Sequence, residues 1–424
     1  MAGHRQGLAA RFNKLDGVSA PYIHCANHDL NLVLCHSSKV KPIQVMMENL
    51  RYLGKFFEYP KRQRTLESAI LTWNEEHPEL KVDLKKITTM CQTRWVEKYN
   101  ALEDFHQMFA VIVNALEQIV NNPSRWDAKA LSEAKGLLNT ISTSDFLAAF
   151  ESTRFLLGFT KSLSTMLQKT TLDVVKAKRE IDLVLATLTG IRGDCETHFS
   201  SVFQQMTAKA NTSGRNITKP RTCKTQTLRK NVESQSPEEY YRRTSFVTML
   251  DSIIMELTTR FTGLAEVAML PFYLLPQNVN DMSVDHEMQI IEFHKRDLPD
   301  PSYTSQELIK WKTFWKNRSE KQSPSSLVEM VHDDILQGES FPNIRTIFNV
   351  SLLAPVSSAT VERANSALKF VKTERRSTMK ESRLNSLVLI FVHKDINIPE
   401  DEIVDIFAQR CPRRLRLQNV ALKE

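Results

Sequence analysis

Apolar residues return every three or four positions along most of the 424-residue chain, which predicts a predominantly helical protein. The longest apolar stripe runs from Trp95 to Ile119 and stops at an Asn-Asn-Pro sequence. Similar stripes cover residues 146–167, 172–185 and 240–261. Because only 11 glycines interrupt the chain, long helices are expected to pack together as a block.

Two segments have the composition of strands instead. They are Tyr22-Ile23 and the stretch 346–353, which is rich in β-branched residues. Between Met206 and Lys230 the apolar pattern gives way to polar residues that include seven Lys or Arg and no acidic residue. The sequence therefore predicts two short strands and a long polar linker or exposed loop.

The overall charge narrows the function only slightly. The chain has 56 Lys or Arg against 49 Asp or Glu and a net charge of +7, a mild excess that suits a polyanionic partner but is common in unrelated proteins. It has no run of about 20 apolar residues that could span a bilayer, and its first residues lack the pattern of a signal peptide. These features predict an intracellular protein without a membrane segment.

Three motifs, taken in order, carry a family resemblance. The first is Cys25-Ala26-Asn27-His28 leading into an apolar helix, and the second is Thr93-Arg94-Trp95 at the head of the longest stripe. The third runs from Pro355 through Glu362-Arg363 to Ile396. Together they resemble the C-x-x-H segment, the Arg-Trp signature and the C-terminal dimerisation signature of the hAT superfamily of DNA transposases. The middle of the chain is similar to the animal branch with zinc-finger MYM-type and 52 kDa repressor-type proteins.

The resemblance implies a fold that is mostly α with a small α/β part, namely a truncated ribonuclease-H-like core interrupted by a large helical insertion. Residues 1–92 would form a partial core segment. Residues 93–340 would form the insertion, with a polar basic loop at 206–239. Residues 341–424 would form the hAT C-terminal dimerisation region and complete the core.

Glu362 lies where the resemblance places the catalytic glutamate. Enzymes of this type resemble other two-metal nucleases, which need two Asp and one Glu to bind a pair of Mg²⁺ or Mn²⁺ ions. The family's aspartates lie upstream of the stretch with which this chain begins, and Asp16 and Asp29 match neither of them. We therefore expect no enzyme activity, no catalytic residue and no cofactor, with Glu362 vestigial. An acidic residue in a first helical turn is also favoured by the helix dipole alone.

Cys25 and His28 have the spacing of metal ligands. The next candidate ligands, Cys35 and His36, do not complete a known tetrahedral zinc pattern, so no metal is expected. Cys25 and His28 are predicted to pack instead. Arg94 and Trp95 could contact DNA in a working transposase. Packing in the core is the favoured role of Trp95, because large aromatic residues at helical spacing are usually buried.

Basic residues of the polar stretch, which begins at Lys209, are candidates for nucleic-acid contact or nuclear import. A solvated loop explains them equally well, and no aromatic residue is interleaved for base stacking. We predict a nuclear protein with at most weak DNA contact. The candidate residues are Lys219, Arg221, Lys224, Arg229 and Lys230.

The C-terminal stretch offers the strongest functional hypothesis. Residues 384–392 are apolar on nearly every side, so this helix must be buried in its own core or in a partner. The resemblance implies a homodimer or a dimer with a related hAT protein, and no small-molecule substrate. The predicted dimerisation residues are Val361, Leu368, Leu384, Leu387, Val388 and Phe391. The alternative is that the chain is a fragment of an active hAT transposase whose zinc finger and two aspartates lie elsewhere.

Overall fold

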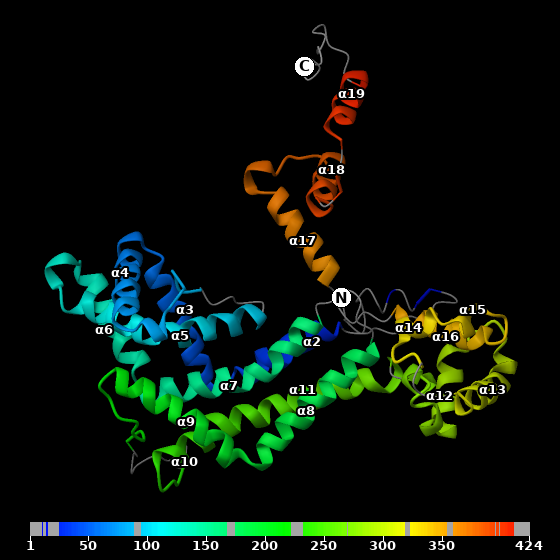
Figure 1. The fold of residues 1–424 in the computed structure, drawn as a ribbon, viewed down its shortest axis with the longest axis horizontal. Helices are drawn as coiled ribbons and strands as arrows, with labels where there is room; N and C mark the ends of the chain where they lie inside the picture. The colour runs from blue at the N-terminus through cyan, green and yellow to red at the C-terminus, as the bar shows by residue number, and fades with distance from the viewer. Residues whose placement is uncertain are drawn as a thin grey trace. The chain divides into compact units, whose positions relative to one another are not determined.

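The computed structural model describes residues 11, 14–15, 25–88, 95–167, 174–221, 232–268, 270–318, 323–353, 359–394, 396–397 and 399–410. The chain divides into two compact units, Met1–Ser358 and Ala359–Glu424. Every regular element in the described ranges is a helix (Figure 1). The predicted helical character is confirmed. The described residues contain no strand, so the ribonuclease-H-like core stays a prediction.

The first unit contains a bundle of long helices around one hydrophobic core, which extends from Ala26 to Phe261. In this bundle α11 lies along both α2 and α8, α7 packs on α3, α5 and α9, and α5 also packs on α4 and α6 (Figure 1). The helices are α2 (Ala26–Ser37), α3 (Lys41–Phe57), α4 (Pro60–Glu76), α5 (Trp95–Val120), α6 (Ala128–Ile141), α7 (Ser144–Met166), α8 (Val174–Gly193), α9 (Cys195–Thr212), α10 (Pro237–Tyr241) and α11 (Thr248–Ala268).

The helices begin and end where the local sequence favours it. The predicted stripe from Trp95 forms α5, which ends immediately before Asn121. Thr143 caps α7 by accepting a hydrogen bond from the backbone N–H of Phe146, and prolines occupy the first turns of α3 and α4, where no donor is lost. Short 3₁₀ turns at Pro78–Leu80 and Pro123–Arg125 connect neighbouring helices.

The predicted loop at 206–239 is wrong at its start. Helix α9 continues to Thr212, and Met206 and Lys209 are buried on its inner side. The helix ends at Gly214, whose φ of 63° is the left-handed conformation that glycine adopts readily. The backbone N–H of Arg215 then donates to the carbonyl of Ala210 at 2.9 Å, which completes a Schellman motif. An extended segment therefore begins only after Gly214.

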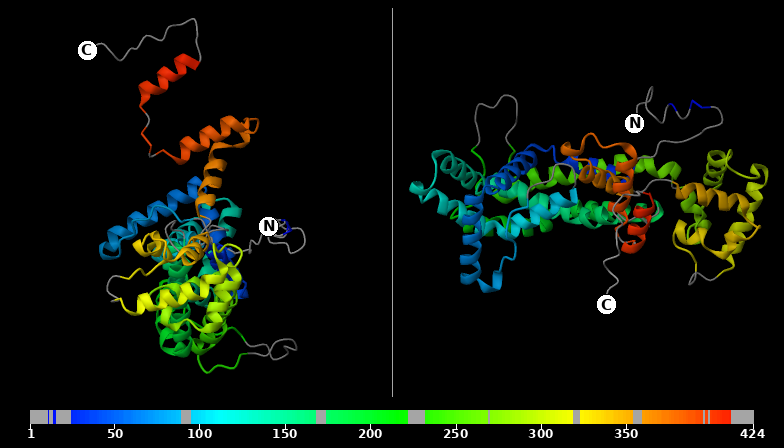
Figure 2. Two further views of the ribbon diagram at one scale, coloured as in Figure 1. Left: turned by 90° about the vertical axis from the view of Figure 1, so that its right-hand side faces the viewer. Right: turned by 90° about the horizontal axis from the view of Figure 1, so that it is seen from above.

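A second hydrophobic core, from Leu270 to Phe348, holds the rest of the first unit together around the fully buried indole of Trp311. Its helices α12, α13 and α16 gather in one block, drawn in yellow to light orange in Figure 2. The elements are α12 (Val284–His294), α13 (Thr304–Lys316), α14 (Leu327–Val331), α15 (Asp334–Gln337) and α16 (Pro342–Leu352), with 3₁₀ turns at Leu270–Leu274, Val279–Asp281 and Pro301–Tyr303.

The strand predicted at 346–353 is wrong, because this segment belongs to α16. Ile344, Ile347 and Phe348 are all fully buried, at the spacing of a helix face. The carboxylate of Glu307 accepts hydrogen bonds from the backbone N–H of Ile344 and from Nδ2 of Asn343, both at 2.9 Å. This capping and burial outweigh the weak β preference of the branched side chains. The other predicted strand, Tyr22-Ile23, lies outside the described residues.

The second unit consists of α17 (Ala359–Val371), a 3₁₀ turn at Glu374–Arg376, α18 (Glu381–Val392) and α19 (Glu400–Arg410). Helices α17 and α18 pack on each other. None of the helices searched in the described part of the chain is long and apolar enough to cross a membrane.

Candidate association surface and buried polar network

The C-terminal unit buries little of its own apolar surface. Among its described residues, Ala367 and Val371 are the hydrophobic side chains that reach a buried position. The ring of Phe370 stacks on that of Phe391, with centroids 4.8 Å apart, yet both side chains are largely open to solvent. Helices α17 and α18 therefore pack along one side only and do not enclose a hydrophobic core.

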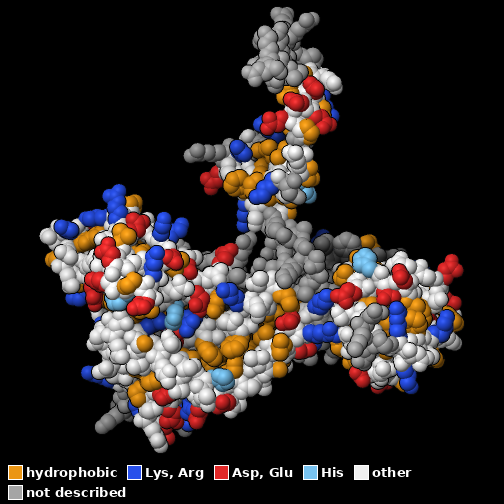
Figure 3. All heavy atoms as spheres, in the orientation of Figure 1, with side chains coloured by type: hydrophobic (Ala, Val, Ile, Leu, Met, Phe, Trp, Pro, Cys, Tyr) orange, Lys and Arg blue, Asp and Glu red, His pale blue; other side chains and the backbone are white. Residues whose placement is uncertain are grey.

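Large apolar side chains cover much of the remaining surface of this unit, and Figure 3 shows hydrophobic atoms gathered over its α17–α18 part. Phe370 is 69% exposed and Ile390 is 63% exposed. Covering such a side chain is worth about 1.5–3 kcal/mol, and patches of this kind mark association sites. The exposed members are Leu368, Phe370, Leu389, Ile390, Phe391, Val392, Ile396, Ile403, Val404, Ile406 and Phe407.

The predicted dimerisation residues lie on this unit with different exposures. Leu368 and Phe391 are exposed, whereas Leu384, Leu387 and Val388 are half-buried. The side chain of Val361 lies outside the described residues. The list as a set of contact residues stays a prediction.

Sequence reasoning missed α19, although its signal was present. Ile403, Ile406 and Phe407 recur at helical spacing and form one apolar face, and Asp401 and Asp405 lie on the opposite side. This amphipathic pattern is shorter and weaker than the nearly continuous apolar run of α18.

The motif residues of the family resemblance lie partly outside the described residues. The backbone of Glu362 lies in the first turns of α17, but its side chain is outside the described part, as are Arg94 and the side chain of Trp95. Cys25 is half-buried just before α2. His28 is exposed on α2, so the prediction that it packs against the insertion is wrong. No group of three or more possible metal ligands occurs among the described residues.

The basic residues predicted to contact nucleic acid are only partly within the described residues. Lys219 and Arg221 are exposed, and Nζ of Lys219 donates to the carbonyl of Ser234 at 2.7 Å. Lys224, Arg229 and Lys230 lie outside the described residues. Lys209, which began the predicted basic loop, is buried and belongs to a different arrangement.

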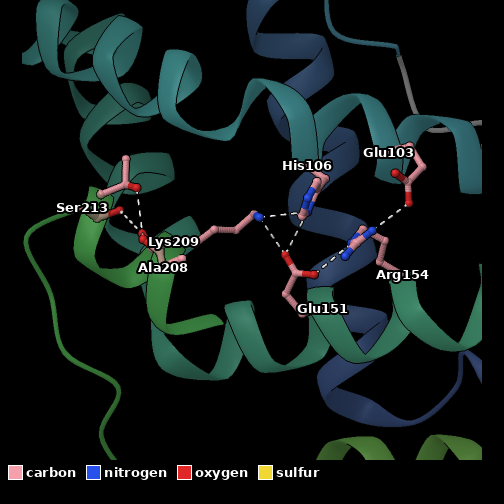
Figure 4. A network of polar contacts seen from close by, with 8 residues as sticks. Glu103, His106, Glu151, Arg154, Ala208, Lys209 and Ser213 are labelled. Atoms are coloured by element: carbon pink, nitrogen blue, oxygen red, sulfur yellow. Dashed lines mark hydrogen bonds and ion pairs between the residues drawn. The ribbon is translucent and has the colours of Figure 1, made fainter. Parts of the chain in front are cut away.

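Lys209 joins a polar network inside the helical bundle (Figure 4). Glu151 on α7 is at its centre: Oε1 lies 2.9 Å from Nζ of Lys209 on α9 and 3.1 Å from Nδ1 of His106 on α5. Oε2 accepts from Nε of Arg154 at 2.9 Å, and Arg154 also donates to Glu103 at 3.1 Å. The network ties three helices together through charge-assisted bonds.

The charges of the network compensate one another. Burial by itself raises the pKa of Glu151, but the hydrogen bond from His106 and the charges of Lys209 and Arg154 outweigh it and lower that pKa to about 2. Burial lowers the pKa of the Lys209 ammonium, although Glu151 opposes this shift. Two carboxylates, Glu103 and Glu151, face the two cations Arg154 and Lys209, which is the balance of a structural ion-pair network.

Nothing in the geometry of the network gives it a reacting position. Both carboxylate oxygens of Glu151 have partners within the network, and its side chain is only 1% exposed. A polar residue inside the apolar run Ala148-Ala149-Phe150-Glu151 was the sequence signal for it, because such an interruption is tolerated in a core only when it is paired. We therefore assign the network to the stability of the bundle.

The comparisons with known proteins agree with the C-terminal location of the association surface. The family model described as the hAT family C-terminal dimerisation region matches residues 302–396. The "52 kDa repressor of the inhibitor of the protein kinase" of Mus musculus is 26% identical over 408 residues, which are 95% of this chain and 53% of that protein. The Homo sapiens protein of the same name is 26% identical over 394 residues, 92% of this chain and 51% of that protein.

The chain spans about half the length of the curated relatives it matches. The dimerisation region covers the block around α13 as well as α17 and α18, and the relatives extend the similarity over nearly all of the remaining chain. The chain therefore carries the C-terminal dimerisation region of the hAT family, and over nearly all of its length it is similar to two proteins named as repressors.

Proposed function

We propose that this protein is non-catalytic and self-associates through the surface formed by α17, α18 and α19. The observation that carries the proposal is the imbalance in this unit, where the described helices leave large side chains such as Phe370 and Ile390 in water and bury little else. A match to a dimerisation region supports a second copy, or a related hAT protein, as the cover. A two-fold dimer would cover the same patch on both chains at once.

The test is the mass of the full chain in solution, measured by size-exclusion chromatography with light scattering. Ile390→Asp adds a charge at a 63% exposed apolar position of α18, and we expect it to convert a micromolar dimer to a monomer. Asn385→Asp is the matched control, because it adds the same charge to an exposed polar position on the opposite side of α18. A monomeric wild-type chain at tens of micromolar, or equal behaviour of the two variants, would refute the proposal.

The absence of catalysis is supported by the motif residues and by the relatives. Only Glu362 lies at a position that the resemblance makes catalytic, and one carboxylate cannot bind a metal pair. Both relatives are named as repressors, which fits a role in protein association. A supercoiled plasmid incubated with the protein and Mg²⁺ or Mn²⁺ should stay intact. Nicking that disappears in Glu362→Gln would identify a working transposase fragment instead.

We further propose a nuclear location with weak, salt-dependent DNA contact. The exposed cations Lys219 and Arg221 in the polar segment after α9 support it, since exposed Lys and Arg neutralise phosphates. A fluorescent fusion of the full chain should accumulate in nuclei. Replacing both residues with Gln should weaken binding to duplex DNA of any sequence by a similar factor and lower its salt dependence. A cytoplasmic fusion or sequence-selective loss would contradict this part of the proposal.

A further inference from the structure

A groove of about 930 Å³ follows one side of α13 in the block built around Trp311. Its first wall is the side of α13 from Ile309 to Phe314 together with Asn317 and Arg318 just beyond the helix, and its second wall includes Ile335 of α15 and Phe341 before α16. Ile309 is 62% exposed at the groove, whereas Trp311, two residues further along α13, is fully buried in the core. The groove is therefore an open channel with an exposed apolar side chain beside the core.

Two cations lie along the groove, one toward each end of the α13 wall. Nζ of Lys310 lies 5.4 Å from the ring centroid of Phe341. The guanidinium carbon of Arg318 lies 5.4 Å from the ring centroid of Phe314. Lys310 lies on α13, and Arg318 lies two residues beyond the end of that helix at Lys316. The groove thus combines an apolar floor with two positive charges.

These cations are not neutralised by the groove itself. No carboxylate is among the residues that line it, and neither Lys310 nor Arg318 forms an ion pair within the described residues. The nearest acidic influence on Lys310 comes from Glu307, whose carboxylate is fully buried and bonded to the start of α16. The groove is electrostatically complementary to an anionic occupant.

The shape of the aromatic floor distinguishes a peptide from a nucleic acid. Base stacking needs an open ring face. Phe341 is only 4% exposed, and Arg318 covers Phe314. The exposed apolar contacts are aliphatic, and aliphatic side chains such as Ile309 suit the anchors of an amphipathic helix. Carboxylates near both ends of such a helix could pair with the two cations.

We propose that this groove binds an acidic amphipathic helix of a partner protein. Its apolar residues would fill the channel between Ile309 and Ile335, and its carboxylates would pair with Lys310 and Arg318. This interaction is separate from self-association through the C-terminal unit, and it needs no residue of α17, α18 or α19.

The probe is a fluorescein-labelled synthetic peptide of about 12 residues with Leu at every third or fourth position and Glu near both ends. Its fluorescence anisotropy is titrated with the full chain, and we expect saturable binding that weakens at least ten-fold in the double variant Lys310→Gln/Arg318→Gln. Lys316→Gln is the matched control, because this exposed cation of α13 does not line the groove. Its affinity should stay within two-fold of wild type.

Two further measurements keep the test decisive. Ile309→Asp should abolish peptide binding without a change in circular dichroism, since this side chain is already in water. Ile390→Asp, which tests the C-terminal surface, should leave peptide binding unchanged, so the two proposals can fail separately. No binding at 100 µM peptide, or an equal loss in Lys316→Gln, would overturn the assignment. A single-stranded oligonucleotide bound through Lys310 and Arg318 in place of the peptide would also overturn it.

Discussion

The helical bundle of the first unit buries its apolar side chains, whereas the C-terminal unit leaves many of its apolar side chains exposed. In the bundle, long helices turn their stripes inward, so that Phe105, Phe150 and Phe199 are essentially removed from water. In the C-terminal unit, α18 is as apolar as any of these helices but contains no buried residue. A helix that is apolar on all sides needs cover on all sides, and one chain supplies it on one side only.

The charged residues of the two regions also differ in burial. Inside the bundle, Glu151 and Lys209 compensate each other at 2.9 Å in a closed network. In the C-terminal unit the acidic residues of α19, such as Asp405, point into solvent. The bundle therefore closes its core within one chain, whereas the C-terminal unit leaves large apolar side chains in solvent.

The sharpest test of this contrast is a pair of Phe→Ala substitutions. Phe150→Ala removes a ring that is 0% exposed and should lower the free energy of unfolding of the bundle by about 3–5 kcal/mol. Phe370→Ala removes a ring that is 69% exposed and should change unfolding of a dilute monomer by less than about 0.5 kcal/mol. Urea unfolding measures the first effect. The second variant should instead weaken dimerisation, which analytical ultracentrifugation measures. Equal unfolding costs would remove the distinction between the two regions.

Glu151→Gln is the next largest change expected. It leaves the buried Lys209 and the half-buried Arg154 without their central counterion, which should cost about 3 kcal/mol. Because the folded pKa of Glu151 is about 2, below that of an unfolded Glu, its contribution is complete above about pH 4.5 and is lost as the pH falls toward 2. Urea midpoints between pH 7 and 2.5 should therefore converge for the wild type and the variant. Glu103→Gln, at the more exposed end of the network, is the control and should cost clearly less.

Local periodicity was sufficient to predict most of the fold. The stripe from Trp95 to Ile119 became α5, because helix formation and burial depend on the same spacing within one segment. Composition failed at 346–353, where Val and Ile suggested a strand. The helix there is decided by Glu307, a residue of another helix that caps its start, and such a partner is not visible in a local pattern.

The candidate sites, too, could be predicted from the sequence only where they depend on residues within one helix. The apolar run of α18 could be recognised from the sequence because it depends on residues within one helix, and it lies in the matched dimerisation region. Its role in association stays a prediction. The burial of Lys209 could not be predicted, because its partners Glu151 and His106 come from two other helices. The groove on α13 was missed for a similar reason, as its second wall at Ile335 and Phe341 is brought to Ile309 only by folding.

His294 is an exception to the satisfied interior of the first unit. It is 2% exposed, and neither ring nitrogen has a hydrogen-bond partner among the described residues. Burial lowers its pKa to about 4, against a weaker opposing effect of Asp297. The unfolded chain therefore binds a proton first as the pH falls, and stability that is complete above about pH 6.5 decreases toward pH 4. The expected loss at pH 5 is about 2 kcal/mol.

His294→Leu should remove this pH dependence and leave the block more stable at pH 5. Hydrogen exchange of α12 and α13 amides between pH 7 and 5, corrected for intrinsic rates, measures the difference. His332→Leu is the control, because His332 is an exposed histidine of the same block and should not alter the profile. An unchanged pH dependence in His294→Leu would show that another group titrates in this range.

The smallest effects concern helix starts, and they separate the two regions once more. Ser283 caps α12 by accepting from the backbone N–H of His286 at 3.2 Å, and the His286 ring in turn accepts from the Ser283 N–H. Ser283→Ala should therefore cost about 1 kcal/mol of unfolding free energy, whereas the exposed Gln289→Ala on the same helix should be nearly neutral.

Helix α18 has no such cap, because Lys380, the residue before its first residue Glu381, makes no side-chain hydrogen bond to the helix start. Lys380→Ser should stabilise α18 by about 0.5–1 kcal/mol, seen as slower amide exchange in its first turn in the dissociated chain. If a partner covers α18, this gain should shrink in the dimer, because packing then protects the helix whether or not its start is capped. A gain of the same size in both states would mean that α18 is not covered on association.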